Sequence, residues 1–268
     1  MKKLIYAVCL ILAVFSVKQA RADGELKVEG IFQGENLFIM NPFAASGVGF
    51  CIYEVTVNGK VSADEINCSA FEVDLTVYNL AQGDPVIVVL KHKSGCTPKV
   101  LNPDVLKPKS TFVASGLKLD KTGKLTWQTK EEKGSLPFLI EQFKWKKWVV
   151  AGRVDGKGTS GVNNYSVNIS LHSGINKIRI KQVDYTKKPR FSEEITFNNL
   201  MPEVTFKPGN NGKTSDFVTF SRATEYEIYD YYGKRVLKGN GAQINVTSLP
   251  KGTYFLNYDC KSESFERK

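Results

Sequence analysis

The sequence predicts an all-β protein built from β-sandwich domains in tandem. Short runs rich in β-branched and aromatic residues recur along the chain, and Gly, Pro and Asn separate them. Tight-turn signals stand between the runs: Asn58-Gly59 is the strongest hairpin signal, and Asp-X-X-Gly occurs at residues 120–123 and 230–233. Strands at such short spacing, joined by tight turns, are typical of two-sheet sandwiches.

Residues 1–22 have the pattern of a signal peptide. Lys2-Lys3 precedes an apolar run over residues 4–17 that is too short to span a bilayer, and Ala20-Arg21-Ala22 offers small residues to signal peptidase. Cys9 lies inside the apolar run and not after it, which argues against a lipid anchor. We therefore predict export and cleavage after Ala22.

From residue 23 to 107 we expect an immunoglobulin-like β-domain. Runs with strand composition follow one another at residues 26–32, 36–43, 47–61, 70–80 and 84–93. The third run contains Asn58-Gly59 and should fold back as a hairpin. Pro103, Pro108 and the polar residues between them predict a linker to the next domain.

Residues 110–200 form the second predicted domain, which alternates strands and turns throughout. Leu125, Trp127, Ile140, Val154, Tyr165 and the run 180–184 stand at characteristic positions of this segment. At these positions the segment resembles the fibronectin type III-like modules that precede C-terminal sorting domains in proteins of Bacteroidota. The segment KWKKW at residues 144–148 replaces a turn that is usually polar in that family. The resemblance implies a fibronectin-like sandwich here.

The third predicted domain, residues 203–268, consists of short strands joined by specific turns. Ile244 and Val246 share one strand face, and so do Tyr254 and Leu256. This order of strands and turns resembles the C-terminal sorting domain of type IX secretion cargo, of the type A kind. The residues that match its motif are Tyr229, Asp230, Gly233, Leu249, Gly252, Tyr254 and Lys268. The resemblance implies a partner, the type IX secretion translocon or another outer-membrane protein.

The cysteines after residue 22 are Cys51, Cys68, Cys96 and Cys260. Export to an oxidising compartment permits disulfides, and four thiols allow three connectivities. Because three of them lie in the first domain, we expect one bridge there, with Cys260 left over. No Cys-X-X-Cys pair is present, and His92 and His172 lack ligand spacing, so the sequence predicts neither a metal site nor a cofactor.

The charge pattern argues against a nucleic-acid partner. The formal net charge is +10, and four of the basic residues lie within residues 1–22. The others are scattered, with small clusters at residues 91–93, 144–147 and 187–188 and no long basic stripe. Weak attraction to an anionic cell surface or to a cell-surface polysaccharide is the alternative.

The tryptophans have different expected roles. Trp127 and Trp148 stand in alternating strand runs and should fill the core. Trp145, between Lys144, Lys146 and Lys147 at an expected hairpin tip, is the candidate binding residue for sugar, lipid headgroup or protein. The alternative is that Trp145 is partly buried on a neighbouring domain.

No catalytic constellation is visible in the sequence. The carboxylate pairs at residues 64–65, 131–132 and 193–194 are adjacent, so on strands they point to opposite faces. No Gly-X-Ser-X-Gly elbow supports a nucleophile. We therefore expect a non-catalytic exported protein that acts at the cell surface as a binding or adhesive module. The alternative is an accessory subunit of the secretion or gliding apparatus that docks through its sorting-like domain.

Overall fold

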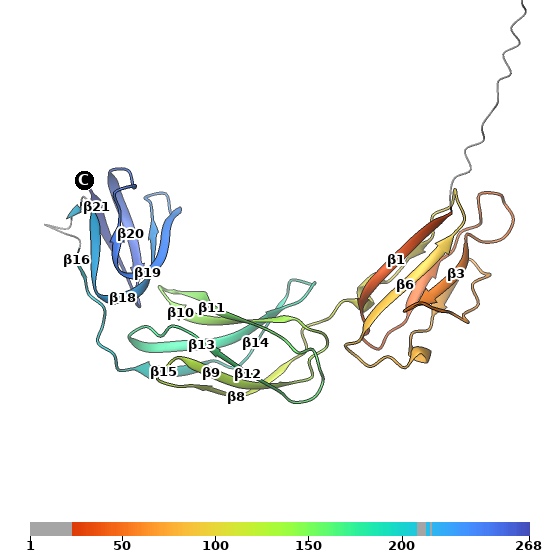
Figure 1. Cartoon of the computed structure of the whole chain (residues 1–268), viewed down its shortest axis with the longest axis horizontal. Coiled ribbons are helices and arrows are strands. Elements are labelled where there is room, and N and C mark those ends of the chain that lie inside the picture. Colours follow the sequence, from red (N-terminus) through yellow and green to blue (C-terminus); the bar gives the residue numbers. More distant parts are fainter. Residues whose placement is uncertain (1–22, 208–212, 215) are drawn as a thin grey trace, which may run out of the picture. The chain divides into compact units, whose positions relative to one another are not determined.

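The computed structural model describes residues 23–207, 213–214 and 216–268 (Figure 1). The predicted signal peptide and its cleavage site up to Ala22 lie outside the described residues. Within the described part, every element is a strand except two short 3₁₀ segments, η1 (Thr76–Tyr78) and η2 (Pro103–Leu106). The predicted all-β class with tandem sandwiches is confirmed. No helix in these ranges is long and apolar enough to cross a membrane.

The chain forms two compact units. One comprises the residues up to 28 together with 36–74 and 87–103, and the other comprises 29–35, 75–86 and 104–268. The second and third predicted domains, residues 110–200 and 203–268, therefore belong to one unit. The predicted limits of the three domains stay predictions.

The N-terminal part contains two antiparallel sheets. One has the order β1 (Gly24–Ile31), β6 (Pro85–His92), β3 (Ile52–Val57) and β4 (Lys60–Val61), and the other has β5 (Ala70–Val73), β2 (Leu37–Met40) and β7 (Lys99–Val100). The strands alternate between buried and exposed residues, as in β2, where Leu37 and Ile39 are fully buried. Asn58 and Gly59 both have positive φ, so the predicted hairpin is confirmed.

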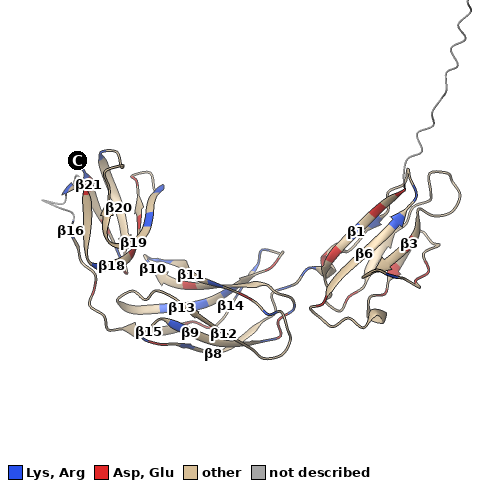
Figure 2. Ribbon diagram, viewed as in Figure 1, with Lys and Arg blue, Asp and Glu red and all other residues tan. Residues whose placement is uncertain are grey.

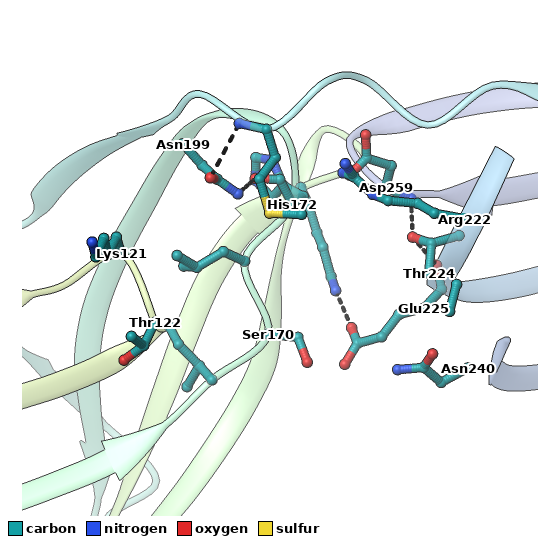
Figure 3. Close-up of a pocket in the computed structure, with 15 residues that line it drawn as sticks. Lys121, Thr122, Ser170, His172, Asn199, Arg222, Thr224, Glu225, Asn240 and Asp259 are labelled. Carbon is teal, nitrogen blue, oxygen red and sulfur yellow. Dashed lines mark hydrogen bonds and ion pairs between the residues drawn. The ribbon is translucent and has the colours of Figure 1, made fainter. Parts of the chain in front are cut away.

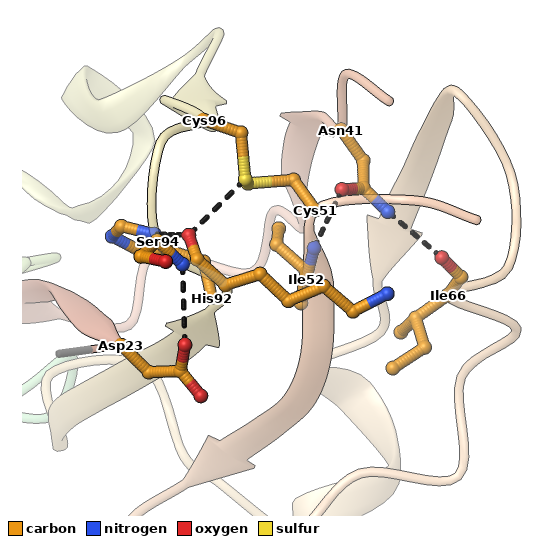
Figure 4. Close-up of a disulfide and its surroundings, with 9 residues drawn as sticks. Asp23, Asn41, Cys51, Ile52, Ile66, His92, Ser94 and Cys96 are labelled. Carbon is orange, nitrogen blue, oxygen red and sulfur yellow. Dashed lines mark hydrogen bonds between the residues drawn. A yellow bond between two sulfur atoms is a disulfide. The ribbon is translucent and has the colours of Figure 1, made fainter. Parts of the chain in front are cut away.

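One disulfide, Cys51–Cys96, closes a loop within this part (Figure 4). Cys68 and Cys260 are free, so the expectation of one bridge in the first domain with Cys260 left over is confirmed. Nearby, the amide of Asn41 accepts the backbone N–H of Ile52 at 2.9 Å and donates to the carbonyl of Ile66 at 2.9 Å. The bridge and the amide together tie the start of β3 to segments distant in sequence.

The middle sandwich, residues 113–199, has two facing sheets. Its first sheet has the order β12 (Asn163–Asn168), β9 (Lys124–Lys130) and β8 (Val113–Leu119). Its second has β11 (Lys147–Asp155), β10 (Pro137–Lys144), β13 (Gly174–Val183) and β14 (Pro189–Phe191), and β15 (Ile195–Asn199) also pairs with β13. The two layers are visible in Figure 1.

The core between these sheets contains the residues that carried the fibronectin-like resemblance. Leu125, Trp127, Ile140 and Tyr165 are buried in one cluster, and Trp127 stacks on Tyr165 at 5.1 Å between ring centroids. The core role of Trp127 is thus confirmed.

The core role predicted for Trp148 is wrong. Its ring is half-buried at the surface of the sandwich. The guanidinium of Arg179 lies 4.0 Å from the ring centroid, and the same group lies 4.0 Å from the ring of Phe191. Trp148 therefore takes part in a surface cation–π stack.

The C-terminal sheet, residues 206–267, has the order β16 (Phe206–Lys207), β18 (Phe217–Tyr229), β20 (Gly252–Tyr258), β21 (Lys261–Arg267) and β17 (Lys213–Thr214). The long strand β19 (Arg235–Asn245) pairs with β18. The predicted shared faces are confirmed, because Ile244, Val246, Tyr254 and Leu256 all lie in one buried cluster.

The disulfide yields a first testable prediction. The two cysteines are 45 residues apart, and a loop of that length should stabilise the fold by about 4 kcal/mol through the unfolded state. The double variant Cys51→Ser/Cys96→Ser should therefore unfold at a lower urea concentration than the parent chain. Cys68→Ser is the matched control and should leave the midpoint unchanged. Equal midpoints for all three chains would contradict a stabilising bridge.

Candidate functional site

The motif residues of the C-terminal sheet set the geometry of its turns. Asp230 accepts the backbone N–H groups of Tyr232 and Lys234, each at 2.9 Å, and Gly233 takes a φ of 80°. Gly252 has a φ of 151°, a value that side chains rarely allow. Both motif glycines therefore adopt a positive φ, the region that favours glycine.

The other motif residues stabilise the C-terminal sheet through burial, ring stacking and hydrogen bonds. Tyr254 is buried, stacks on Phe265 and donates its hydroxyl to the carbonyl of Pro250 at 2.8 Å. Leu249 is buried, and the backbone N–H of Lys268 donates to the carbonyl of Thr214 at 3.0 Å. These motif residues therefore stabilise the fold of the C-terminal sheet.

The most exposed aromatic side chains of this sheet lie at the tip of the β18–β19 hairpin. Tyr231 is 74% exposed and Tyr232 is 92% exposed, and their rings meet edge to face at 6.0 Å. We call this pair the tyrosine tip. An apolar pair held in solvent by a rigid turn is a typical contact element for a protein partner.

The second predicted site, the tryptophan turn (residues 144–147), joins β10 to β11. Trp145 and Lys146 occupy the turn with φ values of 55° and 59°, which confirms the hairpin. The exposure expected for Trp145 is wrong, because the residue is only 8% exposed. A binding role for the four residues stays a prediction. Of the four residues, Lys146 and Lys147 are exposed and Lys144 is buried.

The burial of the tryptophan turn comes from its contact with strand β18. Lys144 forms an ion pair with Glu225, and its ammonium lies 4.5 Å from the centre of the Trp145 ring. Lys147 lies 3.0 Å from the hydroxyl of Tyr229 and 3.4 Å from Glu227. The alternative noted from the sequence, burial against a neighbouring domain, therefore agrees with these contacts.

Glu227 is the buried acceptor of this contact. Burial alone would raise the pKa of its carboxyl, but the hydroxyl of Tyr229 and the ammonium of Lys147 hold the pKa below its ordinary value. Arg235 adds a third partner at 3.1 Å. Tyr229, a residue of the sorting motif, thus joins the C-terminal sheet to the middle sandwich.

A second contact between the same two parts centres on Asp259. Its carboxylate accepts the backbone N–H of Ser173 at 2.8 Å, the backbone N–H of Val204 at 3.1 Å and the hydroxyl of Ser173. Burial would raise the pKa of Asp259, but the bonds from Ser173 and Val204 hold it below the ordinary value. We call this contact the aspartate staple.

The remaining buried carboxylates also have protein partners. Glu132 accepts the hydroxyl of Tyr165 at 2.7 Å and the backbone N–H of Gly158 at 2.8 Å, and burial raises the pKa of Tyr165 to about 12. Glu141 forms ion pairs with Arg179 at 2.7 Å and Lys181 at 3.2 Å. The donors to these carboxylates all belong to the chain itself, so both carboxylates organise the middle sandwich. Lysine and arginine residues are spread over many elements of the described part of the chain (Figure 2).

One comparison identifies the C-terminal part. Residues 211–268 match the family model of the secretion system C-terminal sorting domain, which confirms the resemblance predicted for this segment. No curated protein matches the chain.

Solved structures resemble the chain only distantly. A tetra-tandem repeat from the extending region of a large adhesion protein is 12% identical, with 92% of this chain and 82% of that chain covered and a TM-score of 0.32. The BSP domain of a biofilm-associated protein is 11% identical, with 91% and 63% covered and a TM-score of 0.23. The FN1-FN3 domains of chicken CNTN1 are 11% identical, with 87% and 89% covered and a TM-score of 0.22.

The aspartate staple predicts a specific pH dependence. A carboxyl whose folded pKa is lowered contributes stability above its unfolded pKa, about 3.9, and loses it as the pH falls through the folded value. Asp259→Asn should therefore cost about 1.5–3 kcal/mol at pH 7, the range for hydrogen bonds to a charged group. The same substitution should cost less at pH 3.

Urea unfolding at both pH values measures this difference. Asp155→Asn is the control, because the Asp155 carboxylate is exposed and its pair with Arg153 at 3.4 Å should contribute little. An equal loss at pH 7 and pH 3 would contradict a charged role for Asp259.

Proposed function

We infer that this chain is a non-catalytic β-sandwich protein that its C-terminal domain addresses to the type IX translocon of a Bacteroidota cell. After export it acts at the cell surface, or is released, as a binding or adhesive module. The observation that carries this inference is the match of residues 211–268 to a secretion-system sorting domain. The turn geometry at Gly233 and Gly252 supports it, since both motif glycines have the positive φ that their turns need.

The tyrosine tip is the part of the sorting domain that we expect the translocon to contact. The motif residues Asp230 and Gly233 hold the tip rigid, while Tyr231 and Tyr232 add little to the core. Lys234 and Arg235 follow directly and add positive charge beside the rings. A translocon surface with an apolar groove and acidic rim would complement this arrangement.

The absence of catalysis is part of the proposal. The buried carboxylates Glu132, Glu141, Glu227 and Asp259 are all engaged by hydrogen bonds or ion pairs within the chain. The proposed binding or adhesive role does not by itself name a ligand.

A second candidate function is an accessory subunit of the secretion or gliding apparatus. The observation in its favour is the aspartate staple, together with the contact of the tryptophan turn with β18. A sorting domain that is removed after export has little need of buried ionic contacts to the preceding sandwich. Loss of the C-terminal domain from the mature protein would favour cargo, whereas an intact chain that co-purifies with the translocon would favour the subunit.

Gly252→Val tests whether folding of the C-terminal sheet is needed for delivery. Valine at a φ of 151° should cost about 1–3 kcal/mol and lower the fraction of chain that reaches the cell surface or medium. Gly161→Val is the control, because its added side chain meets open space at a φ that other residues adopt. Fractionation of a type IX-competent host with an epitope-tagged chain measures the outcome. If the destabilised chain is delivered as efficiently as the control, the sorting proposal is wrong.

Replacement of the tyrosine tip tests the contact surface itself. Tyr231→Ser/Tyr232→Ser should leave the melting temperature within about 2 °C, since exposed rings contribute little to stability, and should still reduce delivery. Tyr53→Ser removes a half-exposed tyrosine from the N-terminal part as a matched control. If the double variant is delivered normally, the translocon does not contact the tyrosine tip.

A further inference from the structure

The disulfide of the N-terminal part has a histidine beside it. The sulfur atoms of Cys51 and Cys96 and one ring nitrogen of His92 all lie within 4.8 Å of one another (Figure 4). Cys51 is buried, whereas His92 and Cys96 are partly exposed, so solvent reaches the group through these two residues. All three belong to the same compact unit. Two thiolates and an imidazole are a donor set that Zn²⁺ prefers.

The backbone keeps these three residues together without help from the bridge. Ile52, next to Cys51, is paired with His92 in the ladder of β3 and β6. The carbonyl of Cys51 accepts the backbone N–H of Lys93 at 2.9 Å, and its own N–H donates to the carbonyl of Pro42 at 2.8 Å. Reduction of the bridge should therefore leave two thiols close to the imidazole. The sequence predicted no metal site because this pairing, and not residue spacing, brings Cys51 to His92.

The turn after β6 brings His92 and Cys96 to one point. The ring Nδ1 of His92 lies 3.0 Å from the carbonyl oxygen of Lys93, and the Sγ atom of Cys96 lies 3.2 Å from the same oxygen. The two side chains are four positions apart, and both turn back onto the residue that follows the strand. They therefore present a nitrogen and a sulfur side by side.

Gly24 of β1 makes room for the imidazole ring. A Cβ atom at this position would lie 2.4 Å from Cε1 and 2.5 Å from Nε2 of His92. The ring thus packs directly against the backbone of β1, where any side chain would displace it. A ligand that is already held in place loses less conformational entropy when it binds an ion.

The distances suit a tetrahedral ion once the bond between the sulfurs is open. Zn–S bonds of about 2.3 Å and Zn–N bonds of about 2.0 Å place neighbouring ligand atoms roughly 3.5–3.8 Å apart in a tetrahedron. The three atoms already lie within 4.8 Å of one another, so rotation of the side chains is enough to bring them to a common ion. A water molecule would complete the coordination.

We propose that the reduced N-terminal part binds one Zn²⁺ ion through Cys51, Cys96 and His92, and that this ion and the disulfide exclude each other. A dithiol reductant supplies two electrons and two protons to the bridge and is itself oxidised to a disulfide. Zn²⁺ then displaces the two thiol protons, and the neutral imidazole donates the third electron pair. The oxidised chain does not bind the ion, because its two sulfurs are bonded to each other. The inference goes beyond the proposed function and does not depend on the export route.

The experiment compares the oxidised and the reduced forms of the purified chain, residues 23–268, without oxygen. A phosphine is the reductant, because a dithiol would compete for the ion. Co²⁺ is the optical probe, since thiolate ligands give it a charge-transfer absorption. We expect the reduced chain to bind one Co²⁺ ion that Zn²⁺ displaces, and the oxidised chain to show no such absorption. Zn²⁺ should also raise the melting temperature of the reduced form alone.

Matched substitutions locate the site. Cys51→Ser/Cys96→Ser should abolish the charge-transfer absorption, whereas Cys68→Ser/Cys260→Ser removes the same number of thiols and should leave it unchanged. His92→Gln should weaken Zn²⁺ binding at least about tenfold, since even residues that only orient a ligand change metal affinity about 10- to 100-fold.

Three results would overturn the proposal. They are equal Co²⁺ absorption in the oxidised and reduced chains, unchanged Zn²⁺ affinity in the His92→Gln variant, and loss of binding when Cys68 and Cys260 are replaced. Circular dichroism covers the case in which reduction unfolds the N-terminal part. Zn²⁺ should then restore the strand signal, and a reduced chain that neither binds Zn²⁺ nor refolds with it contradicts the site as well.

Discussion

The buried carboxylate of Asp259 joins the C-terminal sheet to the middle sandwich through hydrogen bonds. A buried carboxylate is stable only when donors surround it, and two of those donors are the backbone N–H groups of Ser173 and Val204. Ser173 lies directly before β13 of the middle sandwich, and Val204 lies between β15 and β16, in the connection to the C-terminal sheet. The aspartate staple therefore holds three segments together through one carboxylate. They are the loop before β13, the connection before β16 and the β20–β21 turn. The tryptophan turn adds a second point of contact through Lys144 and Glu225.

Local chemistry made much of the fold predictable. The hairpins at Asn58-Gly59 and Asp230–Gly233 follow from residues within four positions. Two consecutive residues with positive φ reverse the chain at Asn58-Gly59, and an aspartate oxygen with a positive-φ glycine does so at Asp230–Gly233. The turn at Asp184 uses the same bond to the backbone of Thr186, but Lys187 takes the left-handed φ of 61°. A search for Asp-X-X-Gly misses that turn since the pattern lacks its glycine. Period-two alternation likewise identified Trp127 as a core residue.

Long-range contacts were not predictable in the same way. Trp145 stands in a turn with basic neighbours, a pattern typical of an exposed surface, and its burial depends on acidic residues about 80 positions later. Trp148 has the period-two alternation of a core residue, yet its ring packs against the guanidinium of Arg179 at the surface. Only the register of β10, β11 and β13 brings these two residues together. No sequence pattern predicted the structural role of Asp259, because its partner Ser173 is 86 residues away. Turn and strand rules describe neighbours in sequence. Trp148 instead contacts a distant strand of its own sandwich, and Trp145 and Asp259 lie at the boundary of two folded parts.

A cavity of about 390 Å³ between the middle sandwich and the C-terminal sheet follows from the same two contacts (Figure 3). Lys144 with Glu225 and Asp259 with its donors both border it, so the groups between them are held apart and cannot collapse onto one another. One wall, with Arg222, Thr224 and Asn240, comes wholly from the C-terminal sheet. Proteolytic removal of that sheet would thus abolish the cavity and expose the backbone donors of the staple.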